Sequence, residues 1–339
     1  MTRKSTYEIL YDNFLSKLPE KYAIKLGRNF LRLPIEVIGD YETGDQRLHT
    51  KIGDCELPNP VILSACYHEP HIIRRAMKLG FGAVTLKVTK YPKKGNPEPT
   101  IVRRGEGFVN CVGLKNLGLE VYRKFLKAYR QPKPLIINLN GRKMRDVIEN
   151  LDDYADIFEV NISCPNTEYG LELTRDLYML TLFLNNIVGL TKKPKIIKLS
   201  PSKEFEERNQ SIANQASPDV DAINFGNTMS VEERGLSMGK GGLSGPELYE
   251  NMLRNVENLY EWFRRTRRDI KIIATGGIDS PEKAYKAITK GATCVSYVTG
   301  FVTKGPSLAK RINKYLLEKL DEHDLDSIDE MVGIEVKDS

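Results

Sequence analysis

The segment NISCPNT, residues 161–167, has the clearest chemical potential in the chain, because a thiol lies between two amides where an apolar run ends. The thiol of Cys164 could act as a base or a nucleophile, and the amides of Asn161 and Asn166 could hold a polar ring against it. Pro165 restricts the backbone directly after the thiol. A lone cysteine is more often a buried structural thiol, so the surrounding chain must decide between the two interpretations.

Polar residues and glycines also follow other short apolar runs. They are Lys87; Asn138 and Asn140; Lys198; Asn224, Asn227 and Thr228; Gly276 and Gly277; Thr299 and Gly300. The stem of Lys198 is expected to be buried, because this lysine follows the apolar run KII. A buried ammonium needs an anionic or strongly accepting partner, and a reduced flavin is one. A lysine that extends to the rim of the fold is the alternative.

These residues must be positioned by alternating elements, since from residue 59 short β-branched runs alternate with amphipathic helical runs in eight units. The predicted strands are 60–65, 83–88, 135–140, 158–163, 195–200, 220–226, 270–277 and 293–300. The predicted helices are 70–80, 119–130, 145–155, 171–190, 204–215, 246–263, 281–291 and 307–320. Strands that are apolar on both faces are typical of a parallel sheet covered by helices. The count predicts a (β/α)₈ barrel, with an open doubly wound sheet as the alternative.

We expect three parts in the chain: an N-terminal helical segment over 1–40, the barrel over 45–320 and an acidic C-terminal tail over 321–339. Within the first part, residues 7–38 predict two short helices, split by Pro19 and closed by Pro34. The tail predicts a short acidic helix with a frayed end.

The composition, with 40% hydrophobic and 28% charged residues, is that of a globular protein. No apolar run approaches the roughly 20 residues of a membrane span, and the N-terminus lacks a signal-peptide core, so a cytoplasmic protein is expected. The basic cluster at 264–269 is interpreted as a solvated face, not as a nucleic-acid site. Five cysteines without a CxxC pair, and HEPH at 68–71 without a third ligand, predict neither a disulfide framework nor a metal site.

Two glycine-containing segments after the last two predicted strands suit a phosphate group. TGGI at 275–278 and VTGF at 298–301 each lead toward a helix start, and such loops offer backbone N–H groups to an anion. These two loops are also where barrels commonly bind phosphate. Two ordinary glycine turns are the alternative. GKGGLSG at 239–245 is interpreted as a third glycine-rich loop.

Over residues 45–320 the chain resembles the dihydroorotate dehydrogenase family of FMN enzymes. The resemblance is carried by separated motifs whose order and spacing are together highly specific: NPVILSA, GFGAVTLK, GNPEPTIVR, NCVGLKNLG, NISCPNT, IIKLSP, NTMS, GGLSG, ATGGIDS and YVTGFVTKGP. It implies oxidation of dihydroorotate to orotate in pyrimidine (UMP) biosynthesis. Cys164 would remove the proton from C5, and the hydride from C6 would pass to the flavin.

The resemblance also implies which residues hold the two ligands. Substrate contacts are implied for Lys87, Asn110, Val112, Gly113, Leu114, Asn161, Asn166, Asn227 and Thr228. FMN contacts are implied for Ser64, Ala65, Lys87, Asn138, Asn161, Lys198, Gly245, Gly276, Gly277, Thr299 and Gly300.

Different parts of the chain resemble different classes of the family. Cys164 and Lys87 are similar to the soluble class 1 enzymes, whereas residues 14–34 resemble the helical pair that class 2 enzymes place over a quinone tunnel. Fumarate, a quinone or a partner subunit therefore stay open as electron acceptor, and the helices could form a plain lid or contact the membrane. A homodimer is common in class 1. Two departures from the family are Cys66, where a glycine is usual, and Gly226, where class 2 has a threonine.

Two rival functions remain. A dihydrouracil-type dehydrogenase would not need a cation for a substrate carboxylate, and Lys87 argues mildly against it. A non-redox barrel that binds a phosphorylated ligand would explain the glycine loops but would leave Cys164, the amides and Lys198 without a role.

Overall fold

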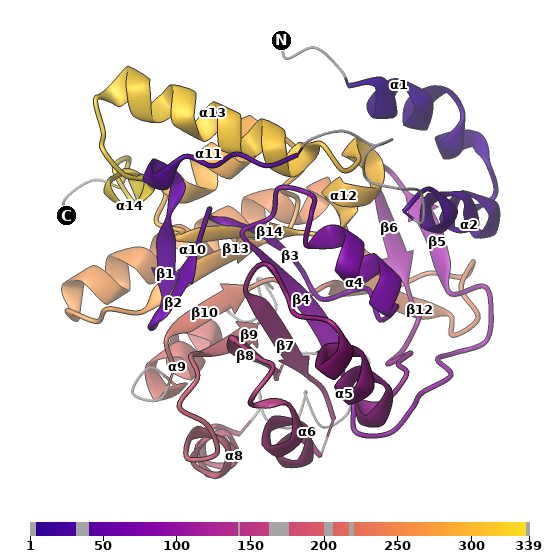
Figure 1. Cartoon of the computed structure of the whole chain (residues 1–339), viewed down its shortest axis with the longest axis horizontal. Coiled ribbons are helices and arrows are strands. Elements are labelled where there is room, and N and C mark those ends of the chain that lie inside the picture. Colours follow the sequence, from indigo (N-terminus) through magenta and orange to yellow (C-terminus); the bar gives the residue numbers. More distant parts are fainter. Residues whose placement is uncertain are drawn as a thin grey trace.

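The computed structural model describes residues 5–31, 41–141, 143–162, 176–199, 206–216 and 220–336. Its centre is a closed barrel of eight parallel strands, which confirms the predicted (β/α)₈ fold and excludes the open sheet (Figure 1). Around the barrel the strands follow the order β10-β13-β14-β3-β4-β7-β8-β9. Their bounds are β3 Val61–Leu63, β4 Ala83–Val88, β7 Leu135–Leu139, β8 Ile157–Asn161, β9 Lys195–Leu199, β10 Ala222–Phe225, β13 Lys271–Thr275 and β14 Cys294–Tyr297.

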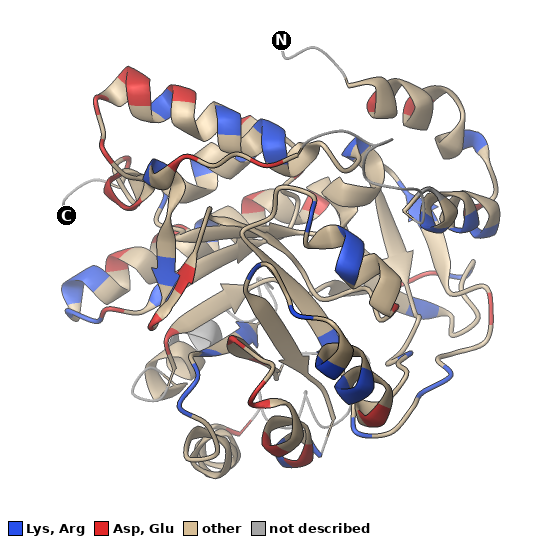
Figure 2. Cartoon of the chain, viewed as in Figure 1, with Lys and Arg blue, Asp and Glu red and all other residues tan. Residues whose placement is uncertain are grey.

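Helices surround the barrel at the eight places that the sequence predicts, and one more forms at Thr299–Lys304, where the sequence predicts the end of the last strand and the loop after it. They are α4 Pro70–Ala76, α5 Leu119–Ala128, α6 Met144–Leu151, α8 Leu177–Val188, α9 Glu206–Ala216, α10 Tyr249–Arg265, α11 Pro281–Thr289, α12 Thr299–Lys304 and α13 Leu308–His323. Their apolar faces pack on the outer face of the strands and form the main hydrophobic core. Lys, Arg, Asp and Glu lie mainly on the helices and loops around the barrel (Figure 2).

A short hairpin that the sequence did not predict closes the end of the barrel at which the strands begin. This end is called the lower end below, and the end at which the strands finish is called the upper end. The hairpin consists of β1 Thr50–Ile52 and β2 Cys55–Leu57, which pair in antiparallel fashion. Ile52 and Leu57 are fully buried against an inner layer of side chains from the barrel strands. Apolar packing therefore fills the interior of the barrel at this end.

A four-stranded antiparallel sheet lies beside the upper end of the barrel, and the sequence did not predict this sheet either. It is formed by β5 Ile101–Arg104, β6 Gly107–Asn110, β11 Met229–Glu232 and β12 Lys240–Ser244, in the order β11-β12-β6-β5. The interpretation of residues 239–245 as a glycine-rich loop was wrong, because most of them form β12. Glycine is required there because a Cβ on Gly242 would lie 2.0 Å from Oγ1 of Thr228.

The N-terminal segment forms the two predicted helices, α1 Thr6–Asn13 and α2 Glu20–Phe30, separated by the 3₁₀ turn η1 Leu15–Lys17. The helices lie beside α12 and β5, above the sheet (Figure 1). The hydroxyl of Tyr7 donates to the carbonyl of Val302 at 2.9 Å, and the backbone N–H of Arg103 donates to Glu20 at 3.3 Å. These contacts fix both helices onto the barrel.

The C-terminal segment is packed more firmly than predicted. The short helix α14 Ile328–Met331 buries Ile328 and Met331 completely. The backbone N–H of Glu335 then donates to the carbonyl of Thr289 at 3.1 Å. The expected frayed end is therefore wrong as far as residue 336, where the described part of the chain stops.

Candidate active site

A cavity of about 360 Å³ opens at the carboxyl ends of the barrel strands and continues beneath α1 and α2; it is called the central cavity below. It gathers every predicted site residue that the structure describes. They are Ser64, Ala65, Lys87, Asn110, Val112, Gly113, Leu114, Asn138, Asn161, Lys198, Asn227, Thr228, Gly245, Gly276, Gly277, Thr299 and Gly300. Cys164 and Asn166 lie outside the described residues.

The floor of the central cavity is polar and buried. Lys198 is 4% exposed, as predicted for a lysine whose stem is enclosed by the barrel. Its ammonium donates to Ser64 Oγ at 3.2 Å and lies 3.7 Å from the carboxylate of Glu159. Sequence analysis missed Glu159, because a carboxylate inside an apolar strand pattern shows no partner in the linear sequence. It is 2% exposed and lies behind the residues that line the cavity.

The predicted amides are joined by hydrogen bonds where β7, β8 and β10 end. Asn227 donates to Oδ1 of Asn161 at 3.1 Å, and Asn161 donates to Oδ1 of Asn140 at 3.1 Å. Asn140 in turn donates to Asn138, which is fully buried. This chain holds the amides in fixed orientations, so they can present donors and acceptors to a planar polar ring without reorganisation.

The two glycine segments after β13 and β14 lie against each other at one end of the cavity. A Cβ on Gly300 would lie 2.5 Å from the carbonyl oxygen of Ile278, so only glycine allows this close approach. Gly277 has φ +72° and leaves no room for a Cβ beside Tyr249. The first N–H groups of a helix have no partner within that helix, and Thr299 begins α12. This donor set fits the phosphate of a flavin nucleotide.

The central cavity also accounts for one departure from the family pattern. At Gly226 a Cβ would lie 2.0 Å from Cβ of Thr275, because Thr275 on β13 fills the space that a side chain at position 226 would need. Thr275 itself lines the cavity and donates to Oδ1 of Asn224 at 2.8 Å. A threonine is thus present at this wall, although it comes from a different strand.

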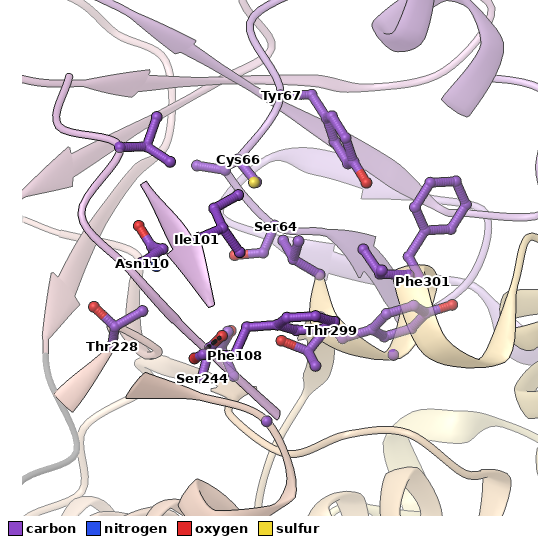
Figure 3. Close-up of a pocket in the computed structure, with 18 of the residues that line it drawn as sticks. Ser64, Cys66, Tyr67, Ile101, Phe108, Asn110, Thr228, Ser244, Thr299 and Phe301 are labelled. Carbon is purple, nitrogen blue, oxygen red and sulfur yellow. Dashed lines mark hydrogen bonds between the residues drawn. The ribbon is translucent and has the colours of Figure 1, made fainter. Parts of the chain in front are cut away.

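The upper part of the cavity combines aromatic side chains with a few polar groups (Figure 3). Tyr67 and Phe301 meet edge to face with ring centroids 6.0 Å apart, and Asn110 and Thr228 lie on the opposite side. Cys66 lies between them with its side chain exposed to the cavity, and the protein atoms around it raise the pKa of its thiol above the usual value. A thiol that is held protonated here is a neutral contact for a ligand.

Arg28 ties α2 to the rim of the barrel. It pairs with Glu69 at 3.1 Å, and the other carboxylate oxygen of Glu69 lies 3.5 Å from Nδ1 of His68. Burial, assisted by the nearby cations, lowers the pKa of His68. Burial alone would raise the pKa of Glu69, but Arg28 and His68 hold it below the usual value. Within the described part of the chain, no three metal-binding side chains gather around these residues.

Comparison with known proteins identifies the family. The family model described as dihydroorotate dehydrogenase matches residues 47–320. The chain belongs to the dihydroorotate dehydrogenase family. It is therefore an oxidoreductase of a flavin-dependent family.

Curated relatives carry two different descriptions. A dihydroorotate dehydrogenase (quinone) from Nostoc punctiforme is 32% identical over 86% of this chain and 85% of its own length. One from Haloarcula marismortui is 29% identical over 95% of this chain and 97% of its own length. The catalytic subunit of a dihydroorotate dehydrogenase B (NAD(+)) from Pyrococcus horikoshii is 30% identical over 86% of this chain and 98% of its own length. Similarity alone therefore does not select the electron acceptor.

A solved structure shares the fold. The DHODH of Eimeria tenella, in complex with ferulenol, superposes with a TM-score of 0.84 at 23% identity and covers 99% of this chain and 100% of its own length. The shared fold includes the segment before the barrel as well as the barrel itself.

Replacing Gly226 tests whether the wall formed by Thr275 is tightly packed. We expect Gly226→Ala to lower the free energy of unfolding by about 1–3 kcal/mol, because the new methyl overlaps Thr275. Gly189→Ala is the control, because a Cβ there meets nothing within 4 Å, and its effect should stay within about 0.5 kcal/mol. Denaturant unfolding of both variants measures the difference, and equal effects would contradict the packing argument.

Proposed function

We propose that this protein is an FMN-dependent dihydroorotate dehydrogenase that oxidises dihydroorotate to orotate in the synthesis of UMP. The observation that carries the proposal is the central cavity, which joins a buried lysine, a chain of amides and two glycine segments at one barrel end. Family membership supports the same reaction. A barrel that only bound a phosphorylated ligand would need the glycine segments but neither Lys198 nor the amides.

The described residues divide the cavity between cofactor and substrate. Gly276, Gly277, Thr299 and Gly300 would hold the phosphate, and Ser64, Ala65, Asn138 and Gly245 would hold the remainder of FMN. Lys198 would place its positive charge against the flavin ring, where the reduced form carries negative charge. When bound, FMN supplies the acceptor for the hydride that leaves C6 of dihydroorotate.

The substrate side of the proposal rests on amides and one lysine. Asn110, Asn161, Asn166, Asn227 and Thr228 would hold the pyrimidine ring together with the Val112–Leu114 backbone, and Lys87 would meet the carboxylate. Cys164 would remove the proton from C5. An ordinary cysteine is only partly ionised near pH 7, so the rate should rise with pH as the thiolate forms.

Replacing the proposed base should separate binding from chemistry. We expect Cys164→Ala to retain FMN but to slow anaerobic reduction of the flavin by dihydroorotate by at least about 10²-fold, which is the usual contribution of a general base. Cys55→Ala, far from the central cavity at the barrel's lower end, should keep the wild-type rate. Loss of the oxidised flavin absorption band measures the rate.

The same assay tests the rival functions. Full reduction rate in Cys164→Ala would remove the thiol from the mechanism. Bleaching by dihydrouracil and not by dihydroorotate would favour the dihydrouracil-type enzyme. A colourless protein that cannot be loaded with FMN would favour the non-redox barrel.

For the electron acceptor we propose a quinone. The part of the central cavity below α1 and α2 has a mainly apolar wall formed by Leu15, Ala23, Ile24, Gly27 and Leu31, and its polar groups include Tyr7, Tyr11, Glu20 and Arg28. Burial and the neighbouring Tyr11 raise the pKa of Tyr7 to about 12, so its hydroxyl stays neutral. A passage with a mainly apolar wall between the flavin site and the helices fits an apolar ring better than it fits fumarate. The alignment with the Haloarcula marismortui quinone enzyme covers 95% of the chain and so includes α2.

Filling this passage should slow the reoxidation of the flavin by quinone but not its reduction by dihydroorotate. Gly27 lines the cavity, and a Cβ at this position would meet nothing within 4 Å, so Gly27→Leu adds bulk without a clash at the backbone. We expect unchanged flavin reduction by dihydroorotate and slower reoxidation by a short-chain quinone, measured by stopped-flow absorbance. Gly189→Leu, at the end of the outer helix α8, is the control. Unchanged quinone reoxidation, or equal slowing with fumarate, would contradict the proposed passage.

We also propose that α1 and α2 contact a membrane surface. Ile9 and Leu10 on α1, Phe14 directly after α1, and Tyr22 and Leu26 on α2 are each at least 44% exposed. Exposed Lys17, Lys21 and Lys25 accompany them, a pairing that suits the boundary between acyl chains and anionic headgroups. No helix in the described ranges is long and apolar enough to span a bilayer. The contact would therefore be peripheral.

Removing the apolar face tests this contact. We expect the triple variant Ile9→Ser, Leu10→Ser, Phe14→Ser to lose most flotation with anionic liposomes, because it removes the exposed apolar area. The matched control is Tyr178→Ser, Met179→Ser, Leu182→Ser on α8, which removes a comparable exposed group elsewhere. Equal flotation of the two triple variants would contradict the assignment to α1.

A further inference from the structure

Among the described residues, the polar floor of the cavity contains one carboxylate, that of Glu159. The proposed mechanism gives this carboxylate no role. Along β8 the side chains alternate, so that Phe158 and Val160 pack in the outer core while Ile157 joins the inner layer of the barrel. Glu159 therefore points into the barrel, one level above that apolar layer. A carboxylate in this place is costly unless donors surround it.

Three donor groups surround the carboxylate. Asn138 Nδ2 donates to Oε1 at 2.5 Å, and Asn224 Nδ2 donates to Oε2 at 2.5 Å. The ammonium of Lys198 lies 3.7 Å from Oε1. Asn138 and Lys198 line the central cavity, whereas Glu159 does not. Any effect of Glu159 on a ligand must therefore pass through these neighbours.

The carboxylate also fixes the direction of the amide chain. An ionised carboxylate only accepts hydrogen bonds, so Asn138 must turn its NH₂ group toward Glu159 and its carbonyl toward Asn140. The same constraint then passes through Asn140 to Asn161 and Asn227, each of which donates toward the floor. On the other side, Asn224 donates to Glu159 and accepts from Thr275.

We propose that Glu159 is a positioning residue that holds Lys198 in place, offsets its charge and sets the direction of the amides that line the cavity. The proposal rests on the proposed function, since Lys198 acts on the flavin and the amides act on the substrate. The proposal goes beyond that function because it places the negative charge of Glu159 beside the positive charge of Lys198 in the floor of the cavity. The charge that a bound flavin experiences is then that of the pair, not that of Lys198 alone.

The consequence is electrostatic. Glu159→Gln removes a negative charge that lies 3.7 Å from the ammonium of Lys198, in a poorly solvated site where charges act strongly on one another. The electron-rich reduced flavin then gains stability relative to the oxidised flavin. We expect Glu159→Gln, which keeps the shape of the side chain, to shift the midpoint potential of bound FMN to a more positive value.

A dithionite titration against reference dyes measures this potential without any substrate. Glu149→Gln is the matched control, because Glu149 lies on α6 with its side chain 48% exposed and should leave the potential unchanged. An unchanged potential in Glu159→Gln would overturn the proposal, and so would an equal shift in Glu149→Gln. A positive shift in a protein that dihydroorotate does not reduce would support Glu159 while refuting the proposed substrate.

A second measurement tests the proposal even if the protein binds no FMN or if a single variant does not fold. In flavin-free protein, the free energies of unfolding of Glu159→Gln, Lys198→Gln and the double variant form a double-mutant cycle. We expect each single variant to be destabilised and the double variant to be less destabilised than their sum, because the double variant removes both charges of the pair together. If a single variant fails to fold and the double variant folds, that result also supports the proposed pairing of Glu159 with Lys198. Additive effects, or failure of all three to fold, would overturn the proposal.

Discussion

The parallel register of the closed barrel is the constraint on which the rest of the site depends. It aligns Lys87 with Asn138, Asn138 with Glu159, and Asn161 with Lys198 on neighbouring strands. Lys198 is in turn aligned with Asn224. Because side chains alternate along each strand, one residue of slip would turn these groups into the apolar helix layer. The polar floor therefore exists only in this register.

Closure of the lower end complements that constraint. The β1–β2 hairpin and the inner apolar layer fill the barrel below the level of Glu159. Charged and amide groups above this layer are thus isolated from solvent on one side and face the central cavity on the other. A site arranged in this way holds its donors and charges before any ligand arrives, which is the basis of electrostatic preorganisation.

The N-terminal helices give this barrel a second functional region. They are held to it by the Arg28–Glu69 ion pair and by the hydrogen bond from Tyr7 to Val302. Their inner side lines the central cavity, while part of their outer side exposes large apolar residues. A plain lid would need the inner side only. The mainly apolar lining of the inner side is why we connect this segment to an apolar acceptor, and the exposed outer side is why we connect it to a membrane surface, although the thiol motif resembles the class 1 enzymes.

The sequence by itself determined the (β/α)₈ fold and the positions of its strands, because the period of the apolar residues is a local property of the chain. The order of its motifs also predicted part of the cavity lining, but not aromatic residues such as Tyr67, Phe108 and Phe301. Lys198 could be expected to be buried from the apolar run before it. The sequence did not reveal the upper sheet, the lower hairpin or the packing of the C-terminal segment, since their short strands and turns gain stability only from distant partners. Nor did it give Glu159 a role, because its partners come from β7, β9 and β10. Only barrel closure brings those strands around it, and a buried charge has meaning only through the groups that compensate it.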